Sequence, residues 1–280
     1  MMHVRLGGFV IHGNSHATLG RCLDSLVAVC DEVLAVDSKS NDGSRELCAA
    51  RNVRSVITDW HGPGVARQIA ARELSHCDYL FFLDADEWLE SKAIECLKSI
   101  HQQNLQLPHY SVRRRDWVTH GTQRYLFRKE TRARLVRRDA AIWQPTWIVH
   151  EALPKRATKP LGIYIEHHFA QHPEELRKKQ AVYAFLWAVR AFAEGRKSRS
   201  SFGRVFASAF RDAVIKGALW RGGIKGLTMS LATAQYHGLK YKYLNAINRG
   251  NYFEAISIFR NGNYNELFNM VQSGPPLLIE

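Results

Sequence analysis

Hydrophobic and polar positions alternate in two regular patterns over the first ninety residues. Short apolar runs are typical of buried strands and lie at residues 4–11, 32–37, 54–58 and 80–84. The segments between them carry apolar residues at helical spacing, at residues 18–29, 44–50 and 65–74. Strands that alternate with helices in this order predict an α/β domain built on a doubly wound, mostly parallel sheet.

Acidic residues close three of these runs. Asp37, Asp59 and Asp84 each follow a strand-like segment, and the carboxyl ends of strands in open α/β sheets form the edge where ligands bind. Asp86 and Glu87 follow shortly after the last run. Two aspartates at i and i+2 can share one divalent cation, or divide between a cation and a sugar hydroxyl. We expect Mn²⁺ or Mg²⁺, completed by substrate phosphates. Taken alone, the triplet also fits a solvated turn.

The second half of the chain changes pattern twice. Residues 113–138 alternate arginine with hydrophobic residues, which predicts a pair of strands with a basic face. From residue 173 onward the pattern is helical, with amphipathic segments that mix Lys and Arg with aromatic residues at 174–194, 202–220 and 224–246. These helices either pack on the catalytic half or lie in a membrane interface. A loose echo of residues 249–252 at 261–264 predicts two short helix-turn units.

Composition and charge narrow the class of protein. The chain has 280 residues and 46% hydrophobic content, enough for one catalytic domain and a smaller appendage. Residues 1–112 carry 10 Lys and Arg against 14 Asp and Glu, whereas residues 113–280 carry 29 against 12. Such a basic half attracts nucleic acid, anionic lipid or a phosphorylated substrate, and the acidic strand ends argue against nucleic acid.

Cysteine usage and hydropathy predict the compartment. The five cysteines include no Cys-x-x-Cys pair and lie mostly in apolar segments, as reduced core thiols do. No export signal and no run of about 20 apolar residues is evident. We therefore expect a cytoplasmic protein, and the basic, aromatic-rich helices after residue 173 favour a peripheral position on the inner face of the plasma membrane.

Two nucleotide-binding signatures are missing. The first strand-to-helix turn reads Ile11-His12-Gly13-Asn14-Ser15 and lacks Gly-x-Gly-x-x-Gly, and no Gly-rich triphosphate loop occurs in the sequence. A bound phosphate therefore needs another source of positive charge, and a cation would provide it.

Several motifs follow one another along the chain in a fixed order. They are Asn14, Arg21-Cys22-Leu23-x-Ser25-Leu26, Val36-Asp37-Ser38, Gly62-x-Gly64-x-Ala66-Arg67, Phe82-Leu83-Asp84-Ala85-Asp86-Glu87, Val149-His150-Glu151 and Glu166-His167-His168. This order resembles that of family 2 inverting glycosyltransferases, and among them the lipopolysaccharide-core β-1,4-glucosyltransferases. The resemblance implies a GT-A fold, a Rossmann-like nucleotide-diphospho-sugar transferase domain. It places the catalytic domain at residues 1–170, with a nucleotide half (1–107) and an acceptor half (108–170), followed by a helical basic region at 171–280. The chain departs from the family at Ser15, where relatives carry Glu, and at Gln68, where they carry Asn.

The resemblance also implies residue roles. Donor binding falls to Asn14, Asp37, Arg67 and Asp84, although Asp37 could instead cap the following turn. Asp84 and Asp86 would hold the cation, with His168 or its neighbour His167 as a third ligand, although a structural role for these histidines is the alternative. Glu151 is the leading candidate for the catalytic base and His150 the second.

The expected reaction is therefore transfer of a hexose, with glucose and UDP favoured, from a nucleotide-sugar donor to a glycolipid, lipopolysaccharide-core or polysaccharide acceptor. An anionic inner-membrane surface is a further expected partner. The alternatives are a nucleotidyltransferase of similar fold and a non-catalytic membrane-associated scaffold.

Overall fold

The computed structural model describes residues 4–149, 153–197, 202–272 and 274–276. Residue contacts divide the chain into two compact units that interleave along the sequence. Unit 1 comprises residues 1–116, 129–145 and 151–168, and unit 2 comprises residues 117–128, 146–150 and 169–280.

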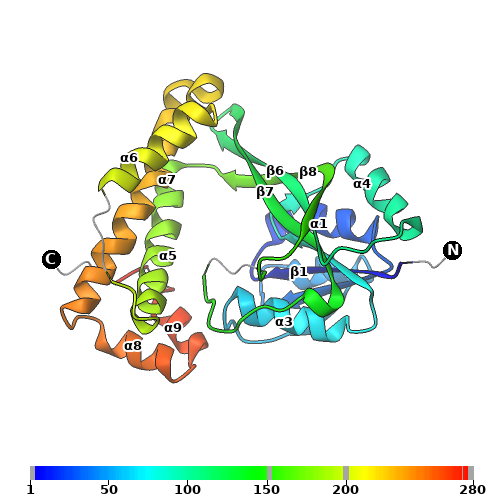
Figure 1. Ribbon diagram of the computed structural model, residues 1–280, viewed down its shortest axis with the longest axis horizontal. Helices are drawn as coiled ribbons and strands as arrows, with labels where there is room; N and C mark the ends of the chain where they lie inside the picture. The colour runs from blue at the N-terminus through cyan, green and yellow to red at the C-terminus, as the bar shows by residue number, and fades with distance from the viewer. Residues whose placement is uncertain (1–3, 150–152, 198–201, 273, 277–280) are drawn as a thin grey trace. The chain divides into compact units, whose positions relative to one another are not determined.

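Unit 1 is built on a mixed sheet, and its strands are drawn in blue to green in Figure 1. The strand order in the described chain is β3-β2-β1-β4-β7-β6-β8-β5. The strands are β1 (Leu6–His12), β2 (Glu32–Asp37), β3 (Arg54–Ile57), β4 (Tyr79–Asp84), β5 (Glu87–Trp88), β6 (His109–His120), β7 (Gln123–Arg137) and β8 (Thr158–Ala170). The first four pair in parallel, and β7 then pairs antiparallel with β4. This order confirms the predicted α/β fold.

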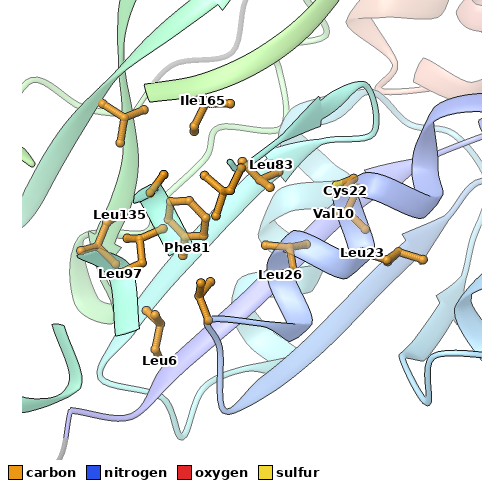
Figure 2. Packing of buried hydrophobic residues seen from close by; sticks show 14 of the residues in the cluster. Leu6, Val10, Cys22, Leu23, Leu26, Phe81, Leu83, Leu97, Leu135 and Ile165 are labelled. Atoms are coloured by element: carbon orange, nitrogen blue, oxygen red, sulfur yellow. The ribbon is translucent and has the colours of Figure 1, made fainter. Parts of the chain in front are cut away.

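Helices cover both faces of the parallel strands because successive strand residues point to opposite sides. They are α1 (His16–Val27), α2 (Ser44–Ala49), α3 (Pro63–Glu73) and α4 (Ser91–Lys98), which a 3₁₀ turn (Ser99–Gln102) extends. On one face, Leu23 and Leu26 of α1 pack with Phe81 and Leu83, as Figure 2 shows. On the other face, Ala70 and its neighbours on α3 pack with the alternate strand residues Phe9 and Phe82.

Unit 2 is mainly helical. Its helices are α5 (Pro173–Ala193), α6 (Phe202–Phe210), α7 (Ala218–Asn248), α8 (Phe253–Arg260) and α9 (Tyr264–Met270), with a π-helical turn at Arg211–Ile215. The single helix predicted at residues 202–220 is divided into α6, the π-helical turn and the start of α7, and Gly217, with a positive φ of 73°, is the N-cap of α7. No helix among the described residues combines the length and apolarity needed to cross a membrane.

A kink in α7 brings two of its turns into unusually close contact. Gly223 leaves the helical region with φ 57° and ψ −138°, and a Cβ on Gly226 would collide with the backbone carbonyl of Ala218. The glycine at 226 is therefore required by the close approach of the backbone.

Replacing Gly226 by alanine is expected to lower the free energy of unfolding by roughly 1–3 kcal/mol, because a backbone segment must shift to admit the methyl group. Gly238→Ala is the matched control on the same helix, since its Cβ would meet only Val205 at 3.5 Å. That control should leave stability unchanged or raise it by up to about 1 kcal/mol. Urea denaturation measures both, and equal effects would contradict the packing argument.

Candidate active site

The carboxyl ends of β2, β1 and β4 meet at one edge of the sheet. The strand register pairs His12 of β1 with Asp37 of β2, and Ile11 of β1 with Asp84 of β4. The structure therefore brings Asp37 and Asp84, which are 47 positions apart in the sequence numbering, to the ends of strands that flank β1. This edge is where a parallel α/β sheet binds its ligand.

Asp37 is the last residue of β2 and is fully buried. Its carboxylate accepts hydrogen bonds from the backbone N–H of Ser40 (3.0 Å), the Ser40 hydroxyl and Nε of Arg45 (2.8 Å). Burial opposes ionisation, but the bonds from Ser40 and Arg45 outweigh it and hold the pKa of Asp37 below its usual value. In this arrangement Asp37 fixes the loop, so direct contact with a nucleotide would require these bonds to rearrange.

Asn14 ties the first loop to the loop after β2. Its backbone N–H donates to the Ser40 hydroxyl (2.9 Å), and its side-chain oxygen accepts from the backbone N–H of Asn41 (2.9 Å). Asn14 has a positive φ of 48°, which asparagine tolerates better than most residues. At the two positions that depart from the family pattern, Ser15 N–H donates to Ser44 (3.0 Å) and the Gln68 amide oxygen accepts from Trp143 N–H (2.9 Å).

Asp84 lies between two arginines. One carboxylate oxygen accepts from Arg67 on α3 (2.6 Å) and the other from Arg134 on β7 (2.7 Å). Burial opposes ionisation of Asp84, but the charges of Arg134 and Arg67 outweigh it and keep the pKa well below the usual value. Both guanidinium groups also lie over the ring of Phe82, at 5.3 Å and 5.0 Å from its centroid.

Glu87 and Asp116 extend this network into the interior. Both side chains are fully buried, and Glu87 accepts from Arg134 (2.6 Å) and Arg114 (3.2 Å). Nε of Arg114 also lies 2.8 Å from Asp116. Glu87 accepts the backbone N–H of Asp84 as well (3.0 Å), which fixes the turn that carries the acids. Buried charges that are paired in this way avoid most of the cost of desolvation.

Asp86 lies next to His167 of β8. Nε2 of His167 lies 3.5 Å from Asp86, and its Nδ1 lies 2.7 Å from Asp116. Burial lowers the pKa of His167, but Asp86 and Asp116 outweigh it and raise the pKa to about 9. His168, the residue favoured from sequence as a ligand, donates its backbone N–H to the backbone oxygen of Asp86 (2.9 Å). The structure thus places the ring of His167 beside the second aspartate.

The donor set at this edge fits a divalent cation that takes few protein ligands. No three His, Cys, Asp or Glu side chains within the described ranges converge on one point as a closed metal site. Asp86 is partly exposed, and Nε2 of His167, at 3.5 Å from it, is a candidate for a second ligand. Mg²⁺ and Mn²⁺ need only one or two protein ligands when substrate phosphates complete the coordination shell. Binding through His167 would first require loss of its proton.

The two candidate bases, His150 and Glu151, lie outside the described residues, so their roles stay predictions.

The residues that sequence reasoning did not assign to the site are Arg114, Arg134 and Asp116. Their signal was the alternation of arginine with apolar residues in residues 113–138, which predicted a basic face on a strand pair. The structure confirms the strands β6 and β7. The side chains of Arg114 and Arg134, however, are buried and both contact the buried carboxylate of Glu87.

An α/β domain of this topology, with acids at the ends of its central strands, is the frame of a nucleotide-diphospho-sugar transferase of the GT-A type. The profile of the family described as Glycosyl transferase family 2 matches residues 9–170, more than half of the chain. The chain belongs to that family and is a glycosyltransferase.

Curated relatives agree with this class. The lipopolysaccharide core biosynthesis glycosyltransferase LpsC of Rhizobium meliloti (strain 1021) is 26% identical over 242 residues, which cover 82% of this chain and 88% of LpsC. An uncharacterized glycosyltransferase of Rickettsia felis is 28% identical over 103 residues, 36% of each chain.

Solved structures show more distant likeness. S. aureus TarS 1–349 aligns with 89% of this chain and 93% of its own, at 13% identity and a TM-score of 0.45. Mannosyl-3-phosphoglycerate synthase from Rubrobacter xylanophilus aligns with 70% of this chain and 76% of its own, at 17% identity and a TM-score of 0.46.

Proposed function

We propose that this glycosyltransferase moves a hexose, with glucose favoured, from a nucleotide-diphosphate sugar, with UDP favoured, to a lipopolysaccharide-core or related glycolipid acceptor. The reaction is proposed to invert the anomeric centre and to depend on Mn²⁺ or Mg²⁺. The observation that carries the proposal is the pair of partly exposed carboxylates Asp84 and Asp86 at the edge of the sheet, with Nε2 of His167 3.5 Å from Asp86.

Because Asp84 is paired with arginines, we assign different roles to Asp84 and Asp86. Both carboxylate oxygens of Asp84 are bound, one by Arg67 and the other by Arg134. Asp84 therefore orients these two guanidinium groups and the turn that carries the acids. It contacts the donor from that fixed position. Asp86, together with His167 or His168, is the proposed cation ligand. A bound cation would accept negative charge from the departing diphosphate. The nearby guanidinium of Arg67 would add to that stabilisation.

Donor recognition is proposed for the loops at the same edge. Asn14 and Asp37 both form hydrogen bonds with Ser40, and this shared partner fixes the two loops against each other. Such preorganised loops hold a nucleotide without reorganisation on binding. Because the carboxylate of Asp37 is occupied by its hydrogen bonds from Ser40, we propose that Asp37 acts mainly by positioning this loop.

Inversion in a single displacement requires a base on the acceptor side to take the proton of the attacking hydroxyl. We assign that role to Glu151 and keep His150 as the second candidate. If Glu151→Gln keeps wild-type kcat while His150→Gln loses it, the role passes to His150.

Similarity to LpsC over most of both chains supports a lipopolysaccharide-core acceptor. The excess of 29 Lys and Arg over 12 Asp and Glu in residues 113–280 suits an acceptor that carries phosphate. Such an acceptor would place the enzyme on the cytoplasmic face of the inner membrane, and we propose that location.

Product analysis with purified enzyme tests the function. We expect UDP release from UDP-glucose in the presence of Mn²⁺, stimulation by a core glycolipid acceptor and loss of activity with EDTA. The new linkage should have the anomeric configuration opposite to that of the donor. Pyrophosphate release from a nucleoside triphosphate would instead identify a nucleotidyltransferase. Natively folded protein that neither binds nor cleaves any nucleotide sugar would point to a scaffold.

A further inference from the structure

Large apolar side chains gather on the surface of unit 2 along α6, the π-helical turn and the first half of α7. Phe202 is 83% exposed, Trp220 is 72% exposed and Ile224 is 80% exposed. We call the whole set the α6–α7 apolar face, and its residues are Phe202, Phe206, Phe210, Ile215, Trp220, Ile224, Leu227 and Leu231. Single exposed hydrophobic residues are ordinary, but eight on three successive elements that pack on one another are grounds to propose an interaction site.

Helical spacing arranges these residues in stripes. The phenylalanines on α6 recur every fourth residue, and the rings of Phe206 and Phe210 stack with centroids 6.5 Å apart. On α7, Ile224, Leu227 and Leu231 follow the kink at Gly223 and have the i, i+3, i+7 spacing of one helix face, whereas Trp220 precedes the kink. The two helices pack along each other, since a Cβ on Gly238 of α7 would lie 3.5 Å from Val205 of α6. Each helix therefore buries one side within unit 2 and leaves an apolar side uncovered.

The charge around this face has one sign. Asp212 is the only acidic residue in the sequence between positions 195 and 253, a segment that also contains Arg204, Arg211, Lys216 and Arg221. Asp212 is fully buried and is neutralised by Arg128 (3.2 Å), Arg211 (2.9 Å) and Lys216 (3.8 Å). The segment thus combines aromatic and aliphatic side chains with an excess of basic ones.

We infer that the α6–α7 apolar face docks onto the surface of an anionic phospholipid bilayer. An amphipathic helix inserts its apolar side at the boundary between headgroups and acyl chains, while its basic residues contact anionic headgroups. Phenylalanine and tryptophan suit this boundary because their rings are large and apolar. A second copy of the chain is a poorer occupant, because two such faces would bring like charges together.

This surface belongs to helices outside the catalytic edge of unit 1, so the inference stands apart from the proposed reaction. Vesicle binding and nucleotide release are separate measurements, and failure of one leaves the other intact.

Flotation with vesicles tests the docking surface in the full-length chain. We expect binding to vesicles that contain phosphatidylglycerol, little binding to pure phosphatidylcholine, and weakening when salt rises from about 0.1 M to about 0.5 M. The double variant Phe206→Ser with Trp220→Ser should bind the anionic vesicles at least about tenfold more weakly. Its nucleotide release without vesicles should equal that of wild type, because neither residue is in the site.

Phe253→Ser provides the matched control. Phe253 is also a highly exposed aromatic residue of unit 2 but lies on α8, outside the α6–α7 apolar face, so this variant should bind vesicles as wild type does. Equal binding by wild type and the double variant overturns the inference, and so does binding that ignores lipid charge. A concentration-dependent dimer that the double variant abolishes would assign the face to a second copy instead.

Discussion

Replacing Asp86 by alanine is expected to lower kcat for nucleotide release by at least about a hundredfold. Asp86 is a partly exposed carboxylate in the turn between β4 and β5. Its loss removes the charge that the proposed cation requires, and it also leaves the imidazolium of His167 with one fewer anionic neighbour. Steady-state release of UDP over a range of Mn²⁺ concentrations measures the effect, and Asp86→Asn tests whether charge or shape matters.

Asp24→Ala is the control for this prediction. Asp24 is an exposed aspartate of the same unit that pairs with Arg51 at 2.7 Å, away from the sheet edge. It should keep wild-type kcat, since an exposed pair of this kind contributes little. If Asp86→Ala is folded and turns over donor as fast as wild type does, the assignment of Asp86 is wrong.

The largest loss of stability is expected from Arg134→Ala, at roughly 3–5 kcal/mol of unfolding free energy. Arg134 is buried and binds Asp84 at 2.7 Å and Glu87 at 2.6 Å. Removing it leaves the fully buried Glu87 with Arg114 as its remaining paired arginine, and the desolvation penalty of that carboxylate is then poorly compensated. Urea denaturation gives the change directly.

Arg137→Ala is the matched control, because Arg137 lies three residues further along the same strand and also binds an aspartate. Its pair with Asp139 at 2.7 Å is largely exposed, so its removal should cost less than about 1 kcal/mol. If Arg134→Ala and Arg137→Ala lower the free energy of unfolding by similar amounts, burial of the Arg134 ion pairs does not increase their contribution to stability.

Much of the fold follows from local pattern. The predicted strand at 32–37 coincides with β2, and the predicted helix at 174–194 differs from α5 by one residue at each end. Periodicity works here because a strand buried on both faces needs an apolar run and a surface helix needs one apolar side. It failed at residues 202–220, where the apolar pattern continues through Gly217 although the backbone turns there.

The candidate site was also predicted only in part, since its acids were found from sequence and their arginine partners were not. The acids were found from sequence because Asp37 and Asp84 end apolar runs, and strand ends share an edge in any parallel sheet. Their partners were not found, because Arg134 is 50 positions from Asp84 and Arg114 is 27 from Glu87. Nothing in an alternating basic segment tells which arginines face solvent and which face an acid across the sheet.

The amino-acid sequence by itself determined the alternation of strands and helices, the acid-ended strands and the basic second half, since each of these is a property of neighbouring residues. Only the tertiary structure decided that Asp84 is held by two arginines, that the ring of His167 lies beside Asp86, and that an apolar side of α6 and α7 stays uncovered. These features depend on strand register and helix packing, which bring together residues that are far apart in the sequence. A local pattern of apolar and polar residues does not specify which of these distant residues come into contact.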